Sequence, residues 1–124
     1  MKQGLDRSIW TNYLNEFTRR NQSRMTRLEV FGENGAQEEE HGLPFAGITL
    51  EQVDGVPSIE IMFGAGVGHE PQHLTRVIAN VKQIMSKRGP DDRDEALEII
   101  DADGEMNLLR FDSAQPDLAY QQRL

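Results

Sequence analysis

The sequence predicts a single α+β domain, in which an N-terminal helix packs on an antiparallel sheet of five to six short strands. Three observations support this class: an apolar stripe at the helical period near the N-terminus, several short segments of alternating apolar and polar residues, and turn-forming pairs between them. A chain of 124 residues is long enough to bury a core of its own. We expect residues 1–112 to form this domain and the polar, aperiodic residues 113–124 to form a loosely ordered tail.

The N-terminal helix is predicted over residues 7–20. Its apolar residues have the spacing that places them on one helical face, namely Ile9, Trp10, Tyr13, Leu14 and Phe17. Asp6 precedes the first turn and can serve as the N-cap, and Leu5 and Trp10 then have the spacing of a hydrophobic staple. The helix therefore has a defined start and one apolar face to bury against the sheet.

Three segments in the first half of the chain alternate as half-buried strands do, namely TRLEVFG at residues 26–32, LPFAGITL at 43–50 and SIEIMF at 58–63. Asn34-Gly35 and Asp54-Gly55 suit the tight turns between strands, because these residue types tolerate a positive φ angle. The intervening AQEEEHG is too charged to be buried. We expect it to form an exposed edge strand or a loop.

The C-terminal segment ALEIIDADGEMNLLRF predicts a β-hairpin with a four-residue loop at residues 101–104. A loop of this length pairs Ile99 with Met106 and Leu97 with Leu108, so that the apolar residues share one face. A two-residue loop would place Leu97 opposite a charged side chain, which fits the alternation less well.

The segment Pro71–Arg88 fits two different periods. A helical stripe would include Leu74, Val77, Ile78, Val81, Ile84 and Met85, and proline is tolerated in the first turn of a helix. Its second half, VKQIMSKR, also alternates as a strand does. Periodicity alone therefore leaves both structures open for this segment.

Four stretches, LDRSIW, LEVFGENGAQEEEHGLPFAGIT, IEIMFG and the final hairpin, resemble a family of small bacterial proteins known as domain of unknown function 5335. The resemblance covers most of the chain except its tail, and it implies an α+β fold and no known activity. Similar proteins have a short element that begins with His-Leu and precedes a strand, and His73-Leu74 matches that start. The resemblance thus implies a short helix over residues 71–79, before the last three strands, and a strand over 81–87. Similar chains often carry a second histidine three residues later, where this sequence has Arg76.

The composition limits the classes of partner. Twenty-one acidic and thirteen basic residues give a formal charge of −8, and we expect no nucleic-acid partner because such binding depends largely on neutralising phosphates. No apolar run approaches the ~18 residues of a membrane-spanning helix, so no membrane partner is expected. The absence of cysteine excludes disulfides and thiolate metal sites, and it suits a reducing cytoplasm.

An acidic run at Glu38, Glu39 and Glu40 has two interpretations. As a solvated strand edge, it would discourage aggregation with other strands. As an interaction surface, it would bind a basic protein partner, and that binding would weaken as salt rises.

The sequence HEPQH fits the HExxH pattern of zinc metalloproteases. In that pattern two histidines on one helical face, here His69 and His73, hold zinc, and the glutamate, here Glu70, acts as the general base. A third ligand is required, and the candidates are His41, Asp94 and Glu95. Pro71 lies inside the motif and glycines precede it, which disfavours an unbroken helix there.

The preceding glycines in FGAGVGH do not complete a dinucleotide-binding fingerprint, because His69 stands where the third glycine is required. We therefore hypothesise a non-enzymatic binding or accessory module of unknown partner and without a cofactor. Two alternatives remain, a zinc-dependent hydrolase built on HEPQH and an acidic protein-interaction module.

Overall fold

The structure, a computed structural model, describes residues 2–33, 35–65 and 72–112. These residues form one α-helix, preceded by a short 3₁₀ helix, and eight β-strands. In chain order the elements are β1 (Lys2–Gly4), η1 (Arg7–Ile9), α1 (Trp10–Asn21), β2 (Met25–Gly32), β3 (Gly35–Val53), β4 (Val56–Ala65), β5 (Gln72–Ile78), β6 (Val81–Arg88), β7 (Asp94–Asp101) and β8 (Met106–Phe111). The protein is thus mostly β. The predicted α+β fold, with five to six strands and a short helix before the last three, is wrong.

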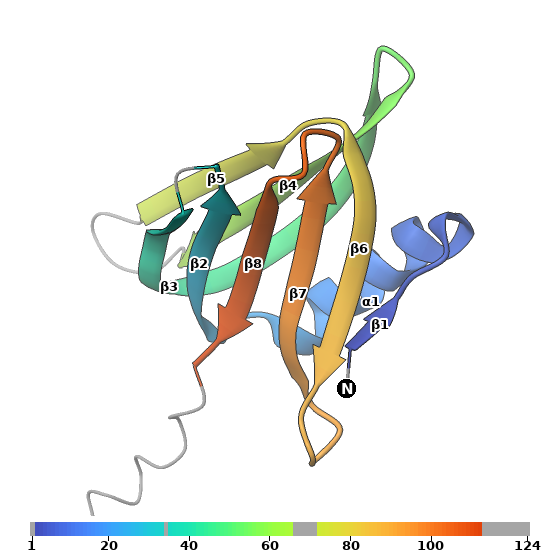
Figure 1. The fold of residues 1–124 in the computed structure, drawn as a ribbon. Helices are drawn as coiled ribbons and strands as arrows, with labels where there is room; N and C mark the ends of the chain where they lie inside the picture. Colours follow the sequence, from blue (N-terminus) through green and yellow to red (C-terminus); the bar gives the residue numbers. More distant parts are fainter. Residues whose placement is uncertain (1, 34, 66–71, 113–124) are drawn as a thin grey trace, which may run out of the picture.

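The strands form one antiparallel sheet in the order β1-β6-β7-β8-β2-β3-β4-β5. The long strand β3 belongs to both parts of it, since its first half pairs with β2 as far as Pro44 and its second half pairs with β4 from Phe45 onward. The sheet folds over along β3, so that β3, β4 and β5 lie behind β2, β8, β7 and β6 (Figure 1). Only Ala79 and Asn80 link β5 to β6, although these strands lie near opposite ends of the order.

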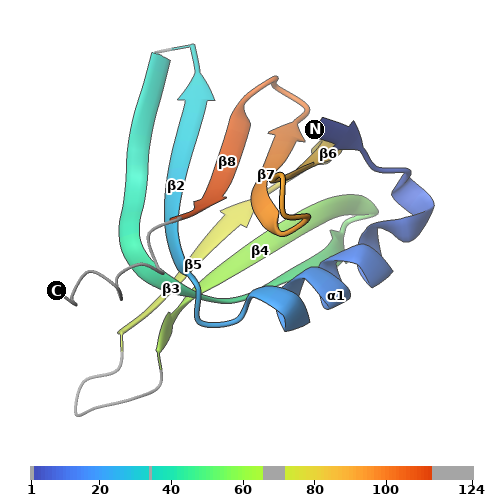
Figure 2. The ribbon, with the colours of Figure 1, turned by 90° about the horizontal axis from the view of Figure 1, so that it is seen from below.

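Helix α1 covers the edge of β3 that β4 leaves unpaired. The Thr18 hydroxyl accepts the N–H of Ile48 at 3.0 Å and donates to the carbonyl of the same residue at 3.2 Å. After the helix, the N–H of Ser23 donates to the Phe45 carbonyl at 2.8 Å. Figure 2 shows α1 running beside β3 and β4. The helix therefore satisfies backbone groups that an open sheet edge would leave exposed.

The core lies between the two layers and the helix. Trp10, Leu14 and Phe17 point into it from α1 and are at most 2% exposed. The Phe17 ring lies 5.7 Å, between centroids, from Phe45 of the back layer and from Phe111 of the front layer. Aromatic pairs of this kind add about 0.5–1.5 kcal/mol each beyond the burial of their area. Phe17 thus joins all three parts of the fold.

The predicted helix over residues 71–79 is wrong, because this segment contains strand β5 instead. Leu74, Arg76 and Ile78 face inward at period two, while Val77 is 54% exposed. The helical stripe counted Val77 as buried and left out Arg76, which hid the strand period. Thr75, Val77 and Ile78 are also β-branched, which favours a strand.

The final hairpin forms, but its predicted register is off by one residue. Met106 lies opposite Ile100, and Asn107 lies opposite Ile99. The Asp101 carboxylate accepts the N–H groups of Asp103 and Glu105 at 2.9 and 3.0 Å, which lengthens the loop by one residue. This side-chain bonding is a local alternative to the strand ladder. As a result Asn107 faces the core instead of the solvent.

Two other elements are confirmed. The predicted helix over residues 7–20 corresponds to η1 followed by α1, and the Asp6 carboxylate caps its start by accepting the Ser8 N–H at 3.0 Å. The predicted strand over residues 81–87 corresponds to β6. The proposed tail at residues 113–124 lies outside the described residues.

We predict that Ser23→Gly stabilises the protein by about 0.5–1 kcal/mol. Ser23 follows α1 with a φ angle of 74°, a left-handed conformation that strains a side chain and that glycine adopts freely. Part of the gain is lost because glycine also adds freedom to the unfolded chain. The free energy of unfolding in urea measures the change. Asn80→Gly, at φ 55°, is the control and should gain less because asparagine tolerates this region. An S23G variant no more stable than wild type would contradict the assignment of strain.

Candidate functional site

The candidate site is built around Asp94, at the start of β7. Lys87 of β6 pairs with Ala96, but the next residue, Arg88, pairs with Asp94, so Glu95 is an extra residue in the ladder. Such a β-bulge re-aims side chains. The bulge turns Asp94 toward the helix, where it is only 5% exposed, and leaves Glu95 exposed.

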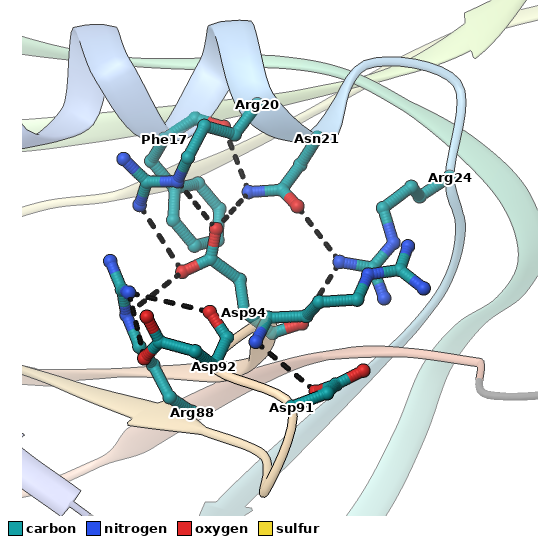
Figure 3. A network of polar contacts seen from close by, with 9 residues as sticks. Phe17, Arg20, Asn21, Arg24, Arg88, Asp91, Asp92 and Asp94 are labelled. Atoms are coloured by element: carbon teal, nitrogen blue, oxygen red, sulfur yellow. Dashed lines mark hydrogen bonds and ion pairs between the residues drawn. The ribbon is translucent and has the colours of Figure 1, made fainter.

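The Asp94 carboxylate is held by the C-terminal end of α1 (Figure 3). Arg20 donates to both carboxylate oxygens, from Nε to Oδ2 at 2.8 Å and from Nη2 to Oδ1 at 3.2 Å. Asn21 Nδ2 donates to Oδ2 at 2.8 Å. Arg88 Nε lies 3.9 Å from Oδ1. The buried carboxylate thus accepts a bidentate hydrogen bond from one arginine and a hydrogen bond from an amide, and a second arginine lies nearby. A buried charge is unfavourable unless it is paired and hydrogen-bonded in this way.

Arg24, in the loop after α1, extends the network toward the solvent. Its Nη1 donates to Asn21 Oδ1 at 2.8 Å and to the backbone carbonyl of Asp94 at 2.9 Å. Its guanidinium carbon lies over the Phe111 ring, 4.3 Å from the centroid, a cation–π contact. Arg24 is therefore fixed by hydrogen bonds on one side and by an aromatic ring on the other.

The electrostatics of the network favour the charged forms of the central pair. Burial alone would raise the pKa of Asp94, but hydrogen bonds from Arg20 and Asn21 and the charges of Arg20 and Arg88 outweigh it, so its pKa lies below the ordinary 3.8. The hydrogen bond with Asp94 raises the pKa of Arg20, against the effect of burial. The pKa of Arg24 is lowered by burial and then by the charge of Arg93.

A hollow of about 1010 Å³ opens beside this network, where β7 begins and β8 ends. Acidic and apolar residues line it together with four basic residues, namely Arg24, Lys87, Arg93 and Arg110. Lys87 lies 3.7 Å from a carboxylate oxygen of Glu95, and Arg110 lies 3.7 Å from one of Glu29. Among residues 2–33, 35–65 and 72–112, Arg24 and Arg93 form no ion pair with a carboxylate. Arg24 and Arg93 thus neighbour each other in the hollow without a direct ion pair, although carboxylates such as Asp91 and Asp112 also line it.

The histidines of the zinc hypothesis are only partly placed. His69 and Glu70 lie outside the described residues. His73 is exposed on β5, opposite Gly64, and the backbone of His41 lies on β3, opposite Arg27. Within the described part of the chain, no three histidine, aspartate or glutamate side chains converge on a possible metal position. The zinc-hydrolase hypothesis remains a prediction.

The other two candidate ligands, Asp94 and Glu95, lie in the network and at its margin. Sequence reasoning singled out Asp94 as a possible metal ligand and missed its ion pair with Arg20. The two residues are 74 positions apart, and no local pattern joins them. The charged stretches RRNQSR and RGPDDRD were the available signal, but neither indicates that they meet.

The acidic run is part of the sheet. The backbones of Glu38 and Glu40 lie on β3 opposite Glu29 and Leu28 of β2. The role of Glu38, Glu39 and Glu40 as an interaction surface remains a prediction. No helix in the described ranges has the length and apolar character needed to cross a membrane.

Comparison with known proteins identifies a family. A family model described as "Family of unknown function (DUF5335)" matches residues 1–118. The resemblance noted in the sequence is thereby confirmed. No curated protein and no solved structure matches the chain.

We predict that Asp94→Asn destabilises the protein by about 3 kcal/mol. The substitution keeps the shape of the side chain but removes the buried charge that accepts both hydrogen bonds from Arg20, whereas Arg88 keeps its ion pair with Asp92. Asp103→Asn, in the exposed loop of the final hairpin, removes the same charge and should change stability by less than about 0.5 kcal/mol. Urea unfolding compares the two variants. Equal effects would show that Asp94 does not hold the fold together.

The contribution of Asp94 should also depend on pH in a defined direction. Because its folded-state pKa lies below 3.8, the folded protein binds this proton less readily than the unfolded chain. The stabilisation is complete above the unfolded pKa and is lost as pH falls through the lowered folded pKa. The difference in unfolding free energy between wild type and D94N should therefore be constant above about pH 5 and shrink toward about pH 2. A difference that stays constant over this range would contradict the assignment.

Proposed function

The chain belongs to the DUF5335 family, a family of unknown function, and we propose that it is a non-enzymatic binding module whose hollow beside Arg24 holds an anionic group of its ligand. The group is a carboxylate or a phosphate, since both match the planar donors of arginine. The observation that carries the proposal is that Arg24, which is held in place, and the exposed Arg93 are two like charges lining one hollow. An anion between them would form the direct ion pair that neither side chain makes with a carboxylate of the described residues.

The guanidinium group of Arg24 is already oriented by contacts within the protein. The two hydrogen bonds from its Nη1 and its contact with Phe111 define the plane of the guanidinium group. A donor that is already ordered loses less side-chain entropy when it binds. The hollow of about 1010 Å³ is large enough for a small molecule or a short peptide end.

The network argues for binding rather than acid–base chemistry. A general base works best when its pKa is near the working pH. Asp94 instead has a lowered pKa, and its two oxygens accept hydrogen bonds from Arg20 and Asn21. It is a weak base that orders its neighbours, which fits a recognition site.

A second candidate function is the acidic interaction module. The first half of β3 pairs with β2 on one side, and no described strand pairs with its other side in this region. A basic protein partner could approach Glu38, Glu39 and Glu40 along this edge. We propose a bacterial cytoplasm as the location in either case, in keeping with a chain that contains no cysteine.

We predict that the wild-type protein binds inorganic phosphate or citrate at one site, and that Arg24→Gln weakens this binding about tenfold or more. The loss follows from removing a charge-assisted hydrogen-bond donor. Isothermal titration calorimetry with each anion measures the affinity. Arg93→Gln, whose side chain is exposed, should weaken binding without disturbing the fold.

The matched control is Arg19→Gln. Arg19 lies on the exposed face of α1, beside Glu16 and away from the hollow, and its removal changes the net charge by the same amount. Its affinity for the anions should equal that of wild type. Equal losses in R19Q and R24Q would indicate general attraction to the surface, and no loss in either R24Q or R93Q would overturn the proposal.

A further inference from the structure

Backbone edges without a described partner strand include those of β1, the first half of β3 and β5, and these three differ in how they are protected. β1 is one terminal strand and has only three residues. The first half of β3 contains the acidic run. β5, the other terminal strand, has seven residues and contains no proline, lysine or acidic residue. Short length and charge are the usual protections of an edge. β5 is longer than β1, and its outward-facing side chains His73, Thr75 and Val77 include no lysine, arginine or acidic residue, since its one such residue, Arg76, points inward.

The side chains of β5 alternate cleanly. His73, Thr75 and Val77 point outward and are exposed, and Val77 is 54% exposed. The charge of Arg76 is directed inward, where Nε and Nη2 donate to Asn107 Oδ1 at 3.1 and 3.0 Å. This contact fixes β5 over β8 of the opposite layer. The edge is therefore held in an extended form that can accept another strand.

We propose that β5 pairs with β5 of a second copy of this chain, antiparallel and centred on Thr75. A two-fold axis at this residue places Thr75 opposite its own counterpart, and Val77 opposite His73 of the partner subunit. Threonine pairs and pairs with a β-branched residue are favourable across antiparallel strands. The two exposed valines are covered, and the two sheets become continuous through the shared edge.

Charge favours a second copy of the chain at this place more than elsewhere on its surface. The chain carries −8, so two copies repel each other on average. The strand QHLTRVI contributes no negative charge, and its one basic residue, Arg76, is directed inward toward Asn107 and away from a partner strand. The two copies therefore meet along a strip that is free of acidic side chains in its own strand.

Cross-linking tests the register. The chain contains no cysteine, so Thr75→Cys introduces a single thiol. Directly opposed residues of antiparallel strands have their Cα atoms about 4.5–5.5 Å apart, within the range of about 4.4–6.8 Å that a disulfide spans. T75C should form a covalent dimer in high yield. Val53→Cys, at an exposed residue of the β3–β4 turn (52% exposed), is the control and should remain mostly monomeric.

Sedimentation equilibrium tests the association without modification. Wild type should show a concentration-dependent dimer, and Val77→Lys should weaken it about tenfold or more, because symmetry introduces the change twice. Val53→Lys should leave the dimer unchanged, and circular dichroism should show the same fold for both variants. A wild-type monomer at all concentrations, a dimer unaffected by V77K, or equal cross-linking of T75C and V53C would overturn the proposal.

Discussion

The buried carboxylate of Asp94 joins parts of the chain that are far apart in sequence. Through Arg20 and Asn21 it holds the last turn of α1, and through Arg88 it reaches the end of β6. The helix depends on this junction because its other contacts with the sheet are mostly apolar and therefore non-directional. With the last turn fixed, Thr18 reaches the backbone of β3 and Phe17 reaches both layers of the core. Asn21 and the backbone carbonyl of Asp94 also orient Arg24. The stability of the fold and the shape of the hollow therefore depend on the same residues.

Helix α1 pairs with backbone groups of the long strand β3 that the folded-over sheet leaves without a partner strand. A sheet that folds over along a single strand must leave part of that strand unpaired on each side, and unpaired backbone groups are costly when buried. In the second half of β3, α1 satisfies these groups with Thr18 and the residues that follow the helix. The first half of β3 lies at an edge and contains three of the four acidic residues of the strand, Glu38, Glu39 and Glu40. The distribution of charge along β3 thus follows the change in its surroundings near Phe45.

Local features of the sequence predicted the elements whose causes are local. The stripe ending at Phe17 and the cap at Asp6 predicted the helix, and the Asp101–Gly104 region predicted a turn. The failures had causes outside the segment concerned. For β5, periodicity left helix and strand open and the family resemblance implied a helix. The strand period was hidden because Arg76 faces inward, where it contacts Asn107, a residue that the shifted hairpin register turns toward the core. The pairing of Asp94 with Arg20 depends on a bulge opposite Arg88 and on the position of α1. Neither can be derived from spacing along the chain.

The pairing of β2 with β8 has a consequence for the order in which the protein can assemble. Thr26 lies opposite Phe111, so the two central strands come from opposite ends of the described chain. Closing so long a loop is entropically unfavourable and slows folding in proteins of this topology. A nascent chain on the ribosome can form the β2–β3–β4 meander early. The second backbone edge of β2, however, has no partner strand until β8 is synthesised. Completion of the core is thereby postponed until β8 has been synthesised, when the whole sheet can close at once.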